Sequence, residues 1–410
     1  MSYIADLHIH SKYSRATSKD MDIAHLADWA KIKGISMLGT GDFTHPLWLA
    51  ELEQKLEMAE YGIFRYEGVD FILTAEVSSI YFKAGRTRKV HNILLAPGFE
   101  TVKEINKMLS EYGSLSSDGR PILSLDCARL AKKLFEISPE IIIIPSHAWT
   151  PHFGIFGSNS GFDSPEECFE DQTPKIFSIE TGLSSDPGMN WRWSKLDRFC
   201  LTSNSDSHSP AKIGREANVF DKKIGYKDLI QILKTKDRAR FLFTVEFFPE
   251  EGKYHWNGHR KCSSPLSPQE SKKLNNRCPK CAGPVTIGVM HRLEALADRP
   301  QGFVLDSSPP YKSMVPLAEI IGDALAKAAD SVTVKKEYNQ LIKTFGNEFH
   351  ILLEMPEEEL AKKCPPKIAR DILNVRRGDL EVAPGYDGEY GKVKIFKARA
   401  ADEEKQLSFF

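Results

Sequence analysis

Histidines and carboxylates that could hold metal ions follow short apolar runs in the first half of the sequence. His8 and His10 alternate on an extended segment, so their imidazoles share one face. The other candidates, from five further segments, are Asp42, Glu76, His91, His147, Asp206 and His208. Such a set suits several divalent ions about 3.5–4 Å apart, which lower the pKa of bound water and hold phosphate oxygens. Phosphoester hydrolysis is therefore predicted, with Asp206 as the carboxylate that binds a metal or activates its water.

A second group of potential ligands lies near the middle of the chain. His259 and Cys262 form one pair with two intervening residues, and Cys278 and Cys281 form another. Four such ligands favour a closed, tetrahedral, structural zinc site. His255 is an alternative fourth ligand, and we choose His259 for its spacing. The odd number of cysteines argues against a disulfide framework.

The elements that must position the first group alternate along residues 1–246. Apolar runs such as 141–144 precede the candidate ligands, and helical patterns such as 23–33 and 127–137 separate these runs. Strands alternating with helices predict an α/β fold with parallel pairing and ligands at the carboxyl ends of the strands. A β/α barrel is preferred to an open doubly wound sheet, because no glycine-rich nucleotide motif follows the first strand.

The amino-acid composition and the hydrophobic periodicity change after residue 246, which predicts further structural units. Residues 247–298 are rich in Gly, Ser, Lys and Cys and need a metal to fold, while helical periodicity returns in 299–398, a mainly helical or mixed domain. Residues 399–410 are predicted to be a flexible tail. The whole chain is 41% hydrophobic with a net charge of −1, so any nucleic-acid site must be local. No membrane span or signal peptide is recognisable, and we expect a cytoplasmic, nucleoid-associated protein without a membrane partner.

Basic and aromatic residues near the candidate ligands could contact a substrate. The candidates are Lys83, Arg86 and Arg88 in a basic loop, Trp149 and His152 in an aromatic loop, and His45. They could grip phosphates or stack on an extruded base. The alternatives are a solvated basic face, packing of the aromatics at the rim, and metal ligation or loop capping by His45.

The ordered motifs resemble the PHP (polymerase and histidinol phosphatase) family. The resemblance rests on Asp6-Leu7-His8-Ile9-His10-Ser11, Gly41-Asp42, Glu76, His91, Ser146-His147 and Ser203 to Ser209. It implies a seven-stranded β/α barrel with three metals, usually zinc or manganese, and phosphoester hydrolysis. Many members have an adjacent Asp-His pair where this chain has Asp42-Phe43-Thr44-His45, which leaves open which of Asp42 and His45 completes the third metal site.

Within that family the chain resembles the endonuclease Q group. The similar segments are residues 39–46, 180–186, the zinc segment with 287–292, and Pro384-Gly385-Tyr386-Asp387-Gly388. The resemblance implies a DNA endonuclease that nicks 5′ to uracil, hypoxanthine, xanthine or abasic sites, with structural and catalytic Zn²⁺ and with Mg²⁺ or Mn²⁺ as alternatives for activity. The competing functions are a PHP-type small-molecule phosphatase and a catalytically silent DNA-binding or helicase-accessory module.

The end of the chain resembles a sliding-clamp-binding peptide. Gln406 and Leu407 precede Phe409 and Phe410, although the spacing departs from the expected pattern. A sliding clamp is therefore a predicted partner, and docking of this end on the protein itself is the alternative.

Overall fold

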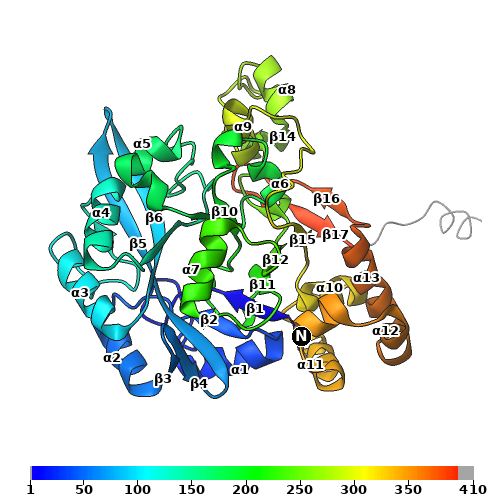
Figure 1. Cartoon of the computed structure of the whole chain (residues 1–410). Coiled ribbons are helices and arrows are strands. Elements are labelled where there is room, and N and C mark those ends of the chain that lie inside the picture. The colour runs from blue at the N-terminus through cyan, green and yellow to red at the C-terminus, as the bar shows by residue number, and fades with distance from the viewer. Residues whose placement is uncertain (1, 396–410) are drawn as a thin grey trace, which may run out of the picture.

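The computed structural model describes residues 2–395 and shows a mixed α/β fold, which confirms the predicted class (Figure 1). Its main sheet has the strand order β15-β12-β11-β1-β2-β5-β4-β3, with β6 and β7 also pairing with β5, and β8 pairing with β6. These strands are β1 (Tyr3–Asp6), β2 (Met37–Gly39), β3 (Glu57–Glu60), β4 (Ile63–Tyr66), β5 (Val69–Lys83), β6 (Arg86–Ala96), β7 (Ile122–Leu123), β8 (Ile142–Pro145), β11 (Ala217–Phe220), β12 (Phe241–Glu246) and β15 (Tyr311–Ser313). A separate pair consists of β9 (Ser178–Glu180) and β10 (Cys200–Thr202).

The prediction of uniformly parallel pairing was wrong. β1, β2 and β5 run parallel, as do β9 and β10, but β5, β6 and β8 pair antiparallel, as do β1, β11 and β12. The reason at β5 and β6 is local: Ala84 and Gly85 have φ of 52° and 79°, so the chain turns back on itself in two residues. Glu76 and His91 consequently lie inside long strands and not at their carboxyl ends.

Helices cover the sheet along the first half of the chain. They are α1 (Ile23–Lys33), α2 (Pro46–Lys55), α3 (Phe99–Leu109), α4 (Cys127–Ile137), α5 (Pro165–Phe169), α6 (Pro187–Asn190) and α7 (Tyr226–Thr235). The sequence sets their ends by capping: the Asp22 carboxylate accepts from the His25 N–H at 3.1 Å at the start of α1, and Gly34 ends it with φ of 86°.

The strands separate two apolar cores, because alternate side chains point to opposite faces. Ile143 belongs to one cluster of buried residues, whereas its neighbours Ile142 and Ile144 belong to the other. In β1, Ile4 likewise faces the first cluster and Ala5 the second. This burial on both faces explains why these strands read as continuous apolar runs.

The second half of the chain forms a projecting module and a helical region (Figure 1). The module contains β13 (Asn257–His259), β14 (Ser264–Leu266), α8 (Pro268–Lys273) and α9 (Val289–Leu296). The helical region contains α10 (Leu317–Leu325), α11 (Val332–Phe345), α12 (Glu357–Lys363) and α13 (Pro366–Arg377), followed by β16 (Glu381–Ala383) and β17 (Lys392–Lys394). A buried ion pair of 2.7 Å between Lys33 Nζ and Glu348 Oε2 joins this region to α1. No helix among residues 2–395 is long and apolar enough to cross a membrane.

Candidate metal centre

Seven of the eight predicted ligands of the first group lie together. They form three overlapping groups, in each of which the potential ligand atoms lie within 4.8 Å of one another. The groups are His8, His10 and Glu76; His10, Asp206 and His208; and Glu76, His91 and His147. Segments more than a hundred residues apart in sequence thus supply one continuous cluster.

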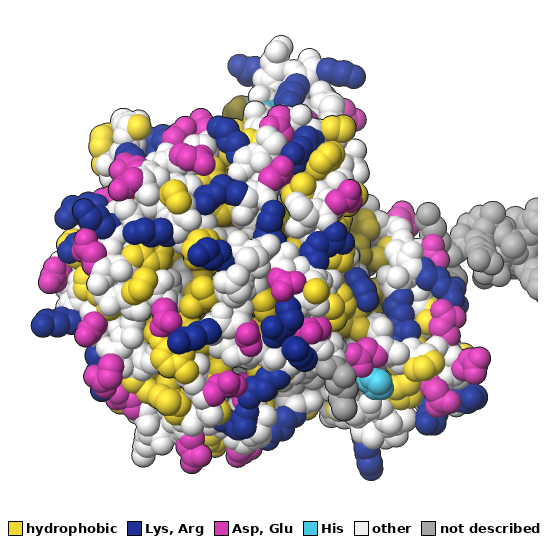
Figure 2. Space-filling view, viewed as in Figure 1, with side chains coloured by type: hydrophobic (Ala, Val, Ile, Leu, Met, Phe, Trp, Pro, Cys, Tyr) yellow, Lys and Arg dark blue, Asp and Glu magenta, His cyan; other side chains and the backbone are white. Residues whose placement is uncertain are grey.

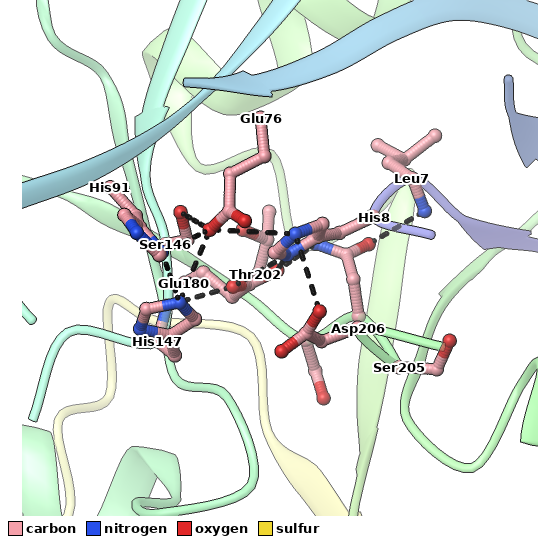
Figure 3. Close-up of polar contacts among 12 residues, drawn as sticks. Leu7, His8, Glu76, His91, Ser146, His147, Glu180, Thr202, Ser205 and Asp206 are labelled. Carbon is pink, nitrogen blue, oxygen red and sulfur yellow. Dashed lines mark hydrogen bonds and ion pairs between the residues drawn. The ribbon is translucent and has the colours of Figure 1, made fainter. Parts of the chain in front are cut away.

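Glu76 lies at the centre of the cluster, between the imidazoles of different segments (Figure 3). Its Oε1 is 3.0 Å from His91 Nδ1 and 3.1 Å from His147 Nε2, and its Oε2 is 3.4 Å from His10 Nε2. Burial opposes ionisation of this carboxyl, but the surrounding imidazoles, His91 and His8 foremost, hold the pKa of Glu76 well below its usual range. An ionised carboxylate with imidazoles near both oxygens is suited to bridge two cations.

Several buried polar atoms in the cluster make no hydrogen bond of ordinary geometry within residues 2–395, although His10 Nε2 and Asp206 Oδ1 lie 3.1 Å apart as an ion pair. They are Nε2 of His8, Nε2 of His10 and Oδ1 of Asp206. Leaving a buried polar atom unsatisfied costs about 1–3 kcal/mol. Divalent cations would satisfy all three atoms at once, and imidazole nitrogen with carboxylate oxygen is a donor set that zinc and manganese accept. The residues present therefore fit a multi-metal site.

Asp206 and His208 reach the cluster from the loop after β10. Asn204 Oδ1 accepts from the Leu7 N–H at 2.8 Å, and Asp6 Oδ1 accepts from the Ser205 N–H at 3.0 Å. These bonds hold the loop beside the segment that carries His8 and His10. Burial opposes ionisation of Asp206, but the His8 and His10 imidazoles outweigh it and hold the pKa of that carboxyl far below its usual range.

The structure places Asp42 outside the three groups. Its carboxylate accepts from the Ser11 N–H at 2.6 Å and from the Ser14 hydroxyl at 2.9 Å, and it lies 3.0 Å from His10 Nδ1. This arrangement orients the His10 ring from behind and does not present the carboxylate to the cluster. The geometry therefore does not support Asp42 as a direct ligand.

Glu180 is a functional candidate that the sequence reasoning missed. Both of its carboxylate oxygens lie 3.1 Å from His8 Nδ1, and they also accept from the His147 N–H at 2.8 Å and Asn204 Nδ2 at 2.9 Å. The residue thus joins three of the segments that build the cluster. A signal was present, because Glu180 ends an apolar run at 176–179 in the manner of the other candidates.

Three members of the cluster, His91, His147 and Asp206, line a cleft of about 510 Å³ that Arg120 also lines. Arg120 Nη1 donates to Glu76 Oε2 at 3.0 Å, and no sequence pattern marked this residue. The cleft shares Thr150, His152 and Ser184 with a neighbouring cavity of about 720 Å³, which also borders the projecting module. His152 is therefore placed where it can meet a molecule that enters both spaces.

Two other predicted substrate contacts lie away from the cleft. His45 is buried with its ring stacked 4.4 Å from that of Tyr13, and burial lowers the pKa of its imidazole. Trp149 is 1% exposed, and its indole N–H donates to Asn190 Oδ1 at 2.8 Å. Trp149 therefore packs at the rim, which was the alternative interpretation of this loop, and its ring is not available to stack on a base.

The three basic candidates hold the β5–β6 hairpin to residues 161–170. Lys83 Nζ lies 2.6 Å from Glu170 Oε1, the Arg86 guanidinium donates to the Gly161 carbonyl at 3.2 Å, and the Arg88 guanidinium lies 4.1 Å from the Phe162 ring. Arg88 is 4% exposed. These positions serve contacts within the protein.

The cysteine group is brought together in the projecting module. The potential ligand atoms of His259, Cys262, Cys278 and Cys281 lie within 4.8 Å of one another, with 3.3 Å between Cys281 Sγ and His259 Nδ1. The apolar core here consists of little more than Leu266, Cys278 and Val285, so the module needs a further source of stability. His255 is outside the group, and burial lowers its pKa to about 4.

The chain is similar to known proteins over nearly its whole length. The model of a family described as the MJ0043 C-terminal domain matches residues 316–379. The uncharacterized protein YqxK of Bacillus subtilis is 30% identical over 95% of this chain and 98% of its own length. The uncharacterized protein MJ0043 of Methanocaldococcus jannaschii is 34% identical over 61% of this chain but only 31% of its own length.

Two solved structures match almost completely. One is the lesion-specific endonuclease PfuEndoQ from Pyrococcus furiosus, with a TM-score of 0.87, 33% identity and 99% of each chain covered. The other is endonuclease Q in complex with a 27-mer duplex that carries an abasic lesion at the active site, with a TM-score of 0.85, 34% identity, and 98% of this chain and 100% of that chain covered.

Proposed function

We propose that this chain, which belongs to the endonuclease Q family, is a metal-dependent DNA-repair endonuclease. It would nick duplex DNA on the 5′ side of uracil, hypoxanthine, xanthine or abasic sites. The observation that carries the proposal is the buried cluster of imidazoles and carboxylates, which includes ligand atoms without hydrogen bonds and three members of which line the cleft. A relative of the same overall structure has been solved with an abasic-lesion duplex at its active site.

The ligands we propose are the seven clustered residues His8, His10, Glu76, His91, His147, Asp206 and His208. Zinc or manganese ions bound there would lower the pKa of a water molecule and neutralise charge on the scissile phosphate, and Mg²⁺ is an alternative for activity. Glu180 and Asp42 orient the His8 and His10 rings, so the ligand nitrogens are held in place before substrate binds. Arg120 contributes a cation at the cleft wall that can contact a phosphate oxygen.

The larger cavity gives room for a lesion nucleotide that has left the helix. Its volume of about 720 Å³ is ample for one nucleotide, and it opens from the cleft through Thr150, His152 and Ser184. We propose that an extruded base enters this cavity and meets His152. Positive and negative side chains are interspersed on the face shown in Figure 2, so such local contacts, rather than a general basic field, must select the substrate.

The finer architecture is also part of the proposal. A seven-stranded barrel over residues 1–246 is supported at the gap between β10 and β11, where Ser203 N–H donates to Asn218 Oδ1 at 3.0 Å and Asn218 Nδ2 donates to Ser203 O at 2.8 Å. Residues 247–298 would form a module closed by structural zinc, and 299–398 a helical and mixed domain. The predicted tail, 399–410, lies outside the described residues, and its binding of a sliding clamp stays a proposal.

The test is a nicking assay with labelled duplexes that carry one uracil, hypoxanthine, xanthine or abasic site, with Mg²⁺, Mn²⁺ or Zn²⁺ added. We expect one nick 5′ to the lesion, none in the undamaged duplex, and no hydrolysis of a phosphomonoester. Asp206→Asn should abolish nicking and leave duplex binding by fluorescence anisotropy largely unchanged, because a neutral amide is a weak cation ligand. Nicking at the wild-type rate by this variant would remove Asp206 from the metal centre, and phosphomonoester hydrolysis alone would favour a phosphatase.

A further inference from the structure

The β5–β6 hairpin has two chemically different faces. Tyr81 and Lys83 of β5 and Arg88 of β6 contact residues 161–170 on one face. Because strand side chains alternate, the opposite face carries Ser78, Ile80 and Phe82 on β5, and the pairing register places His91, Lys89 and Thr87 beside them in that order. At the outer end of that second face, Phe82 is 73% exposed.

The second face is continuous with the cleft. Glu76 belongs to the same alternating series as Ser78 and Phe82, and Ser78 and His91 line the cleft. Ile122 of β7 pairs with Ser78, lines the cleft and is 59% exposed. An apolar track of Ile122, Ile80 and Phe82 thus leads from the candidate metal centre to the outer end of the hairpin.

One of the positive charges of the hairpin lies on the track face. Of the four Lys or Arg in residues 77–92, Lys83, Arg86 and Arg88 contact residues 161–170 on the opposite face, and Lys89 belongs to the track face. Lys89 Nζ lies 5.6 Å from the Phe153 ring at the edge of the cleft. The carboxylate of Glu170, by contrast, pairs with Lys83 on the opposite face. Figure 1 shows the outer end of the hairpin projecting at the upper left, beside α5 and apart from the module that carries α8 and α9.

We propose that this face is an arm that binds the duplex flanking the lesion, with Phe82 packed into a groove of the DNA. The inference rests on the proposed function and adds a contact to it. Six residues separate Phe82 from Glu76, and a strand rises about 3.4 Å per residue, so Phe82 lies about 20 Å from the metal centre. At about 3.4 Å per base pair, the contact falls about six base pairs from the cleaved phosphate.

The experiment varies the length of the flanking duplex. Uracil or abasic duplexes are made with about twelve base pairs on both sides of the lesion, or with about three on one side, each side in turn. We expect wild type to lose about tenfold in kcat/KM when one particular side is shortened. Phe82→Ala should lower kcat/KM on the long duplex by about the same factor. Shortening that side should then have no further effect on the variant. The Kd of the variant for the long duplex, measured by anisotropy, should rise in parallel.

Met58→Ala is the matched control, because Met58 on β3 is 67% exposed and lines neither the cleft nor the neighbouring cavity. It should behave as wild type on every duplex. The proposal of a DNA-binding arm would be overturned if Phe82→Ala had the same kcat/KM as wild type on the long duplex. It would also be overturned if shortening the duplex lowered kcat/KM of the variant by the same factor as that of wild type. Absence of nicking by wild type on every lesion would instead overturn the proposed function, and the anisotropy comparison of Phe82→Ala with Met58→Ala would then still decide the arm.

Discussion

At the scale of single residues, the cluster depends on side chains that hold the ligands as much as on the ligands. Glu180 contacts His8 Nδ1 with both oxygens and leaves Nε2 free to face the cluster. Asp42 does the same for His10 through its contact with Nδ1. A carboxylate behind an imidazole fixes its tautomer and ring orientation and raises its basicity.

We predict that Glu180→Gln weakens metal binding and nicking by about 10- to 100-fold while leaving the fold intact. The amide keeps the shape of the side chain but can no longer balance the His8 ring with a negative charge. Metal affinity by titration, together with nicking at saturating metal, checks the prediction. Glu104→Gln, the same change at an exposed position of α3, is the control for loss of a charge alone. Unchanged metal affinity in Glu180→Gln would contradict the orienting role.

A second prediction concerns pH and Asp186, which caps α6 by accepting from the Met189 N–H at 2.7 Å. Burial, with help from the Glu250 carboxylate, raises the pKa of Asp186 from 3.8 to about 6. The folded chain therefore binds more protons than the unfolded chain between these values, so this group's contribution to stability falls as pH rises from about 4 to about 6.

Asp186→Asn should remove this dependence and still cap the helix. We expect the variant to gain up to about 3 kcal/mol in free energy of unfolding relative to wild type between pH 4 and pH 7. Urea unfolding at a series of pH values measures this difference. A difference that stays constant across the series would show that Asp186 ionises normally in the fold.

At the scale of elements, the projecting module holds its shape with few apolar contacts. β13 and β14 are short, α8 spans only Pro268–Lys273, and the local core is small. The four potential ligands come from two segments, 259–262 and 278–281, on either side of β14 and α8, so a metal there would tie these two segments together. Binding free energy at such a site is folding free energy.

We predict that Cys278→Ser or Cys281→Ser removes one tightly held zinc and makes residues 250–290 sensitive to protease. A serine hydroxyl is a far weaker zinc ligand than a thiolate. Elemental analysis measures the zinc, and limited proteolysis with mass spectrometry locates the cuts. Lys261→Gln, an exposed change in the same module, should leave both measurements at wild-type values. Unchanged zinc content in the cysteine variants would refute the site.

At the scale of the whole molecule, the long hairpin and the projecting module extend from the sheet that carries the metal centre (Figure 1). The cleft of about 510 Å³ and the cavity of about 720 Å³ lie along this surface and share residues. The helical region is attached elsewhere, through the ion pair between Lys33 on α1 and Glu348, which follows α11. The candidate site and the attachment of the helical region therefore use separate surfaces.

We predict that deleting residues 403–410 abolishes binding to the sliding clamp of the source organism without changing nicking of free oligonucleotides. The deleted segment contains Gln406, Leu407, Phe409 and Phe410, which would bind as a short tethered peptide and raise the local concentration at replicating DNA. Co-elution on size-exclusion chromatography is the measurement. If the shortened chain still co-elutes with the clamp, or the full chain never does, the clamp proposal is wrong.

The sequence by itself predicted the ligands from which the chemistry proposed for this chain follows. The His-x-His alternation, the carboxylates after apolar runs and the two pairs around residues 259–281 are local patterns, and each predicts ligands through spacing alone. The α/β class followed from the alternation of apolar runs with helical periods, and the endonuclease Q family followed from the order of the motifs.

Only the tertiary structure decided which side chains face the cluster. Asp42 lies behind His10 and Glu180 lies behind His8, and neither belongs to the clustered ligands. Lys83, Arg86 and Arg88 face residues 161–170, whereas Phe82 faces outward. The antiparallel return of β6 likewise placed Glu76 and His91 side by side within their strands. The physical reason is that the pairing register of a strand decides which face of the sheet each of its side chains points to. Contacts between distant segments establish this register, and a shift by one residue would move every side chain to the opposite face.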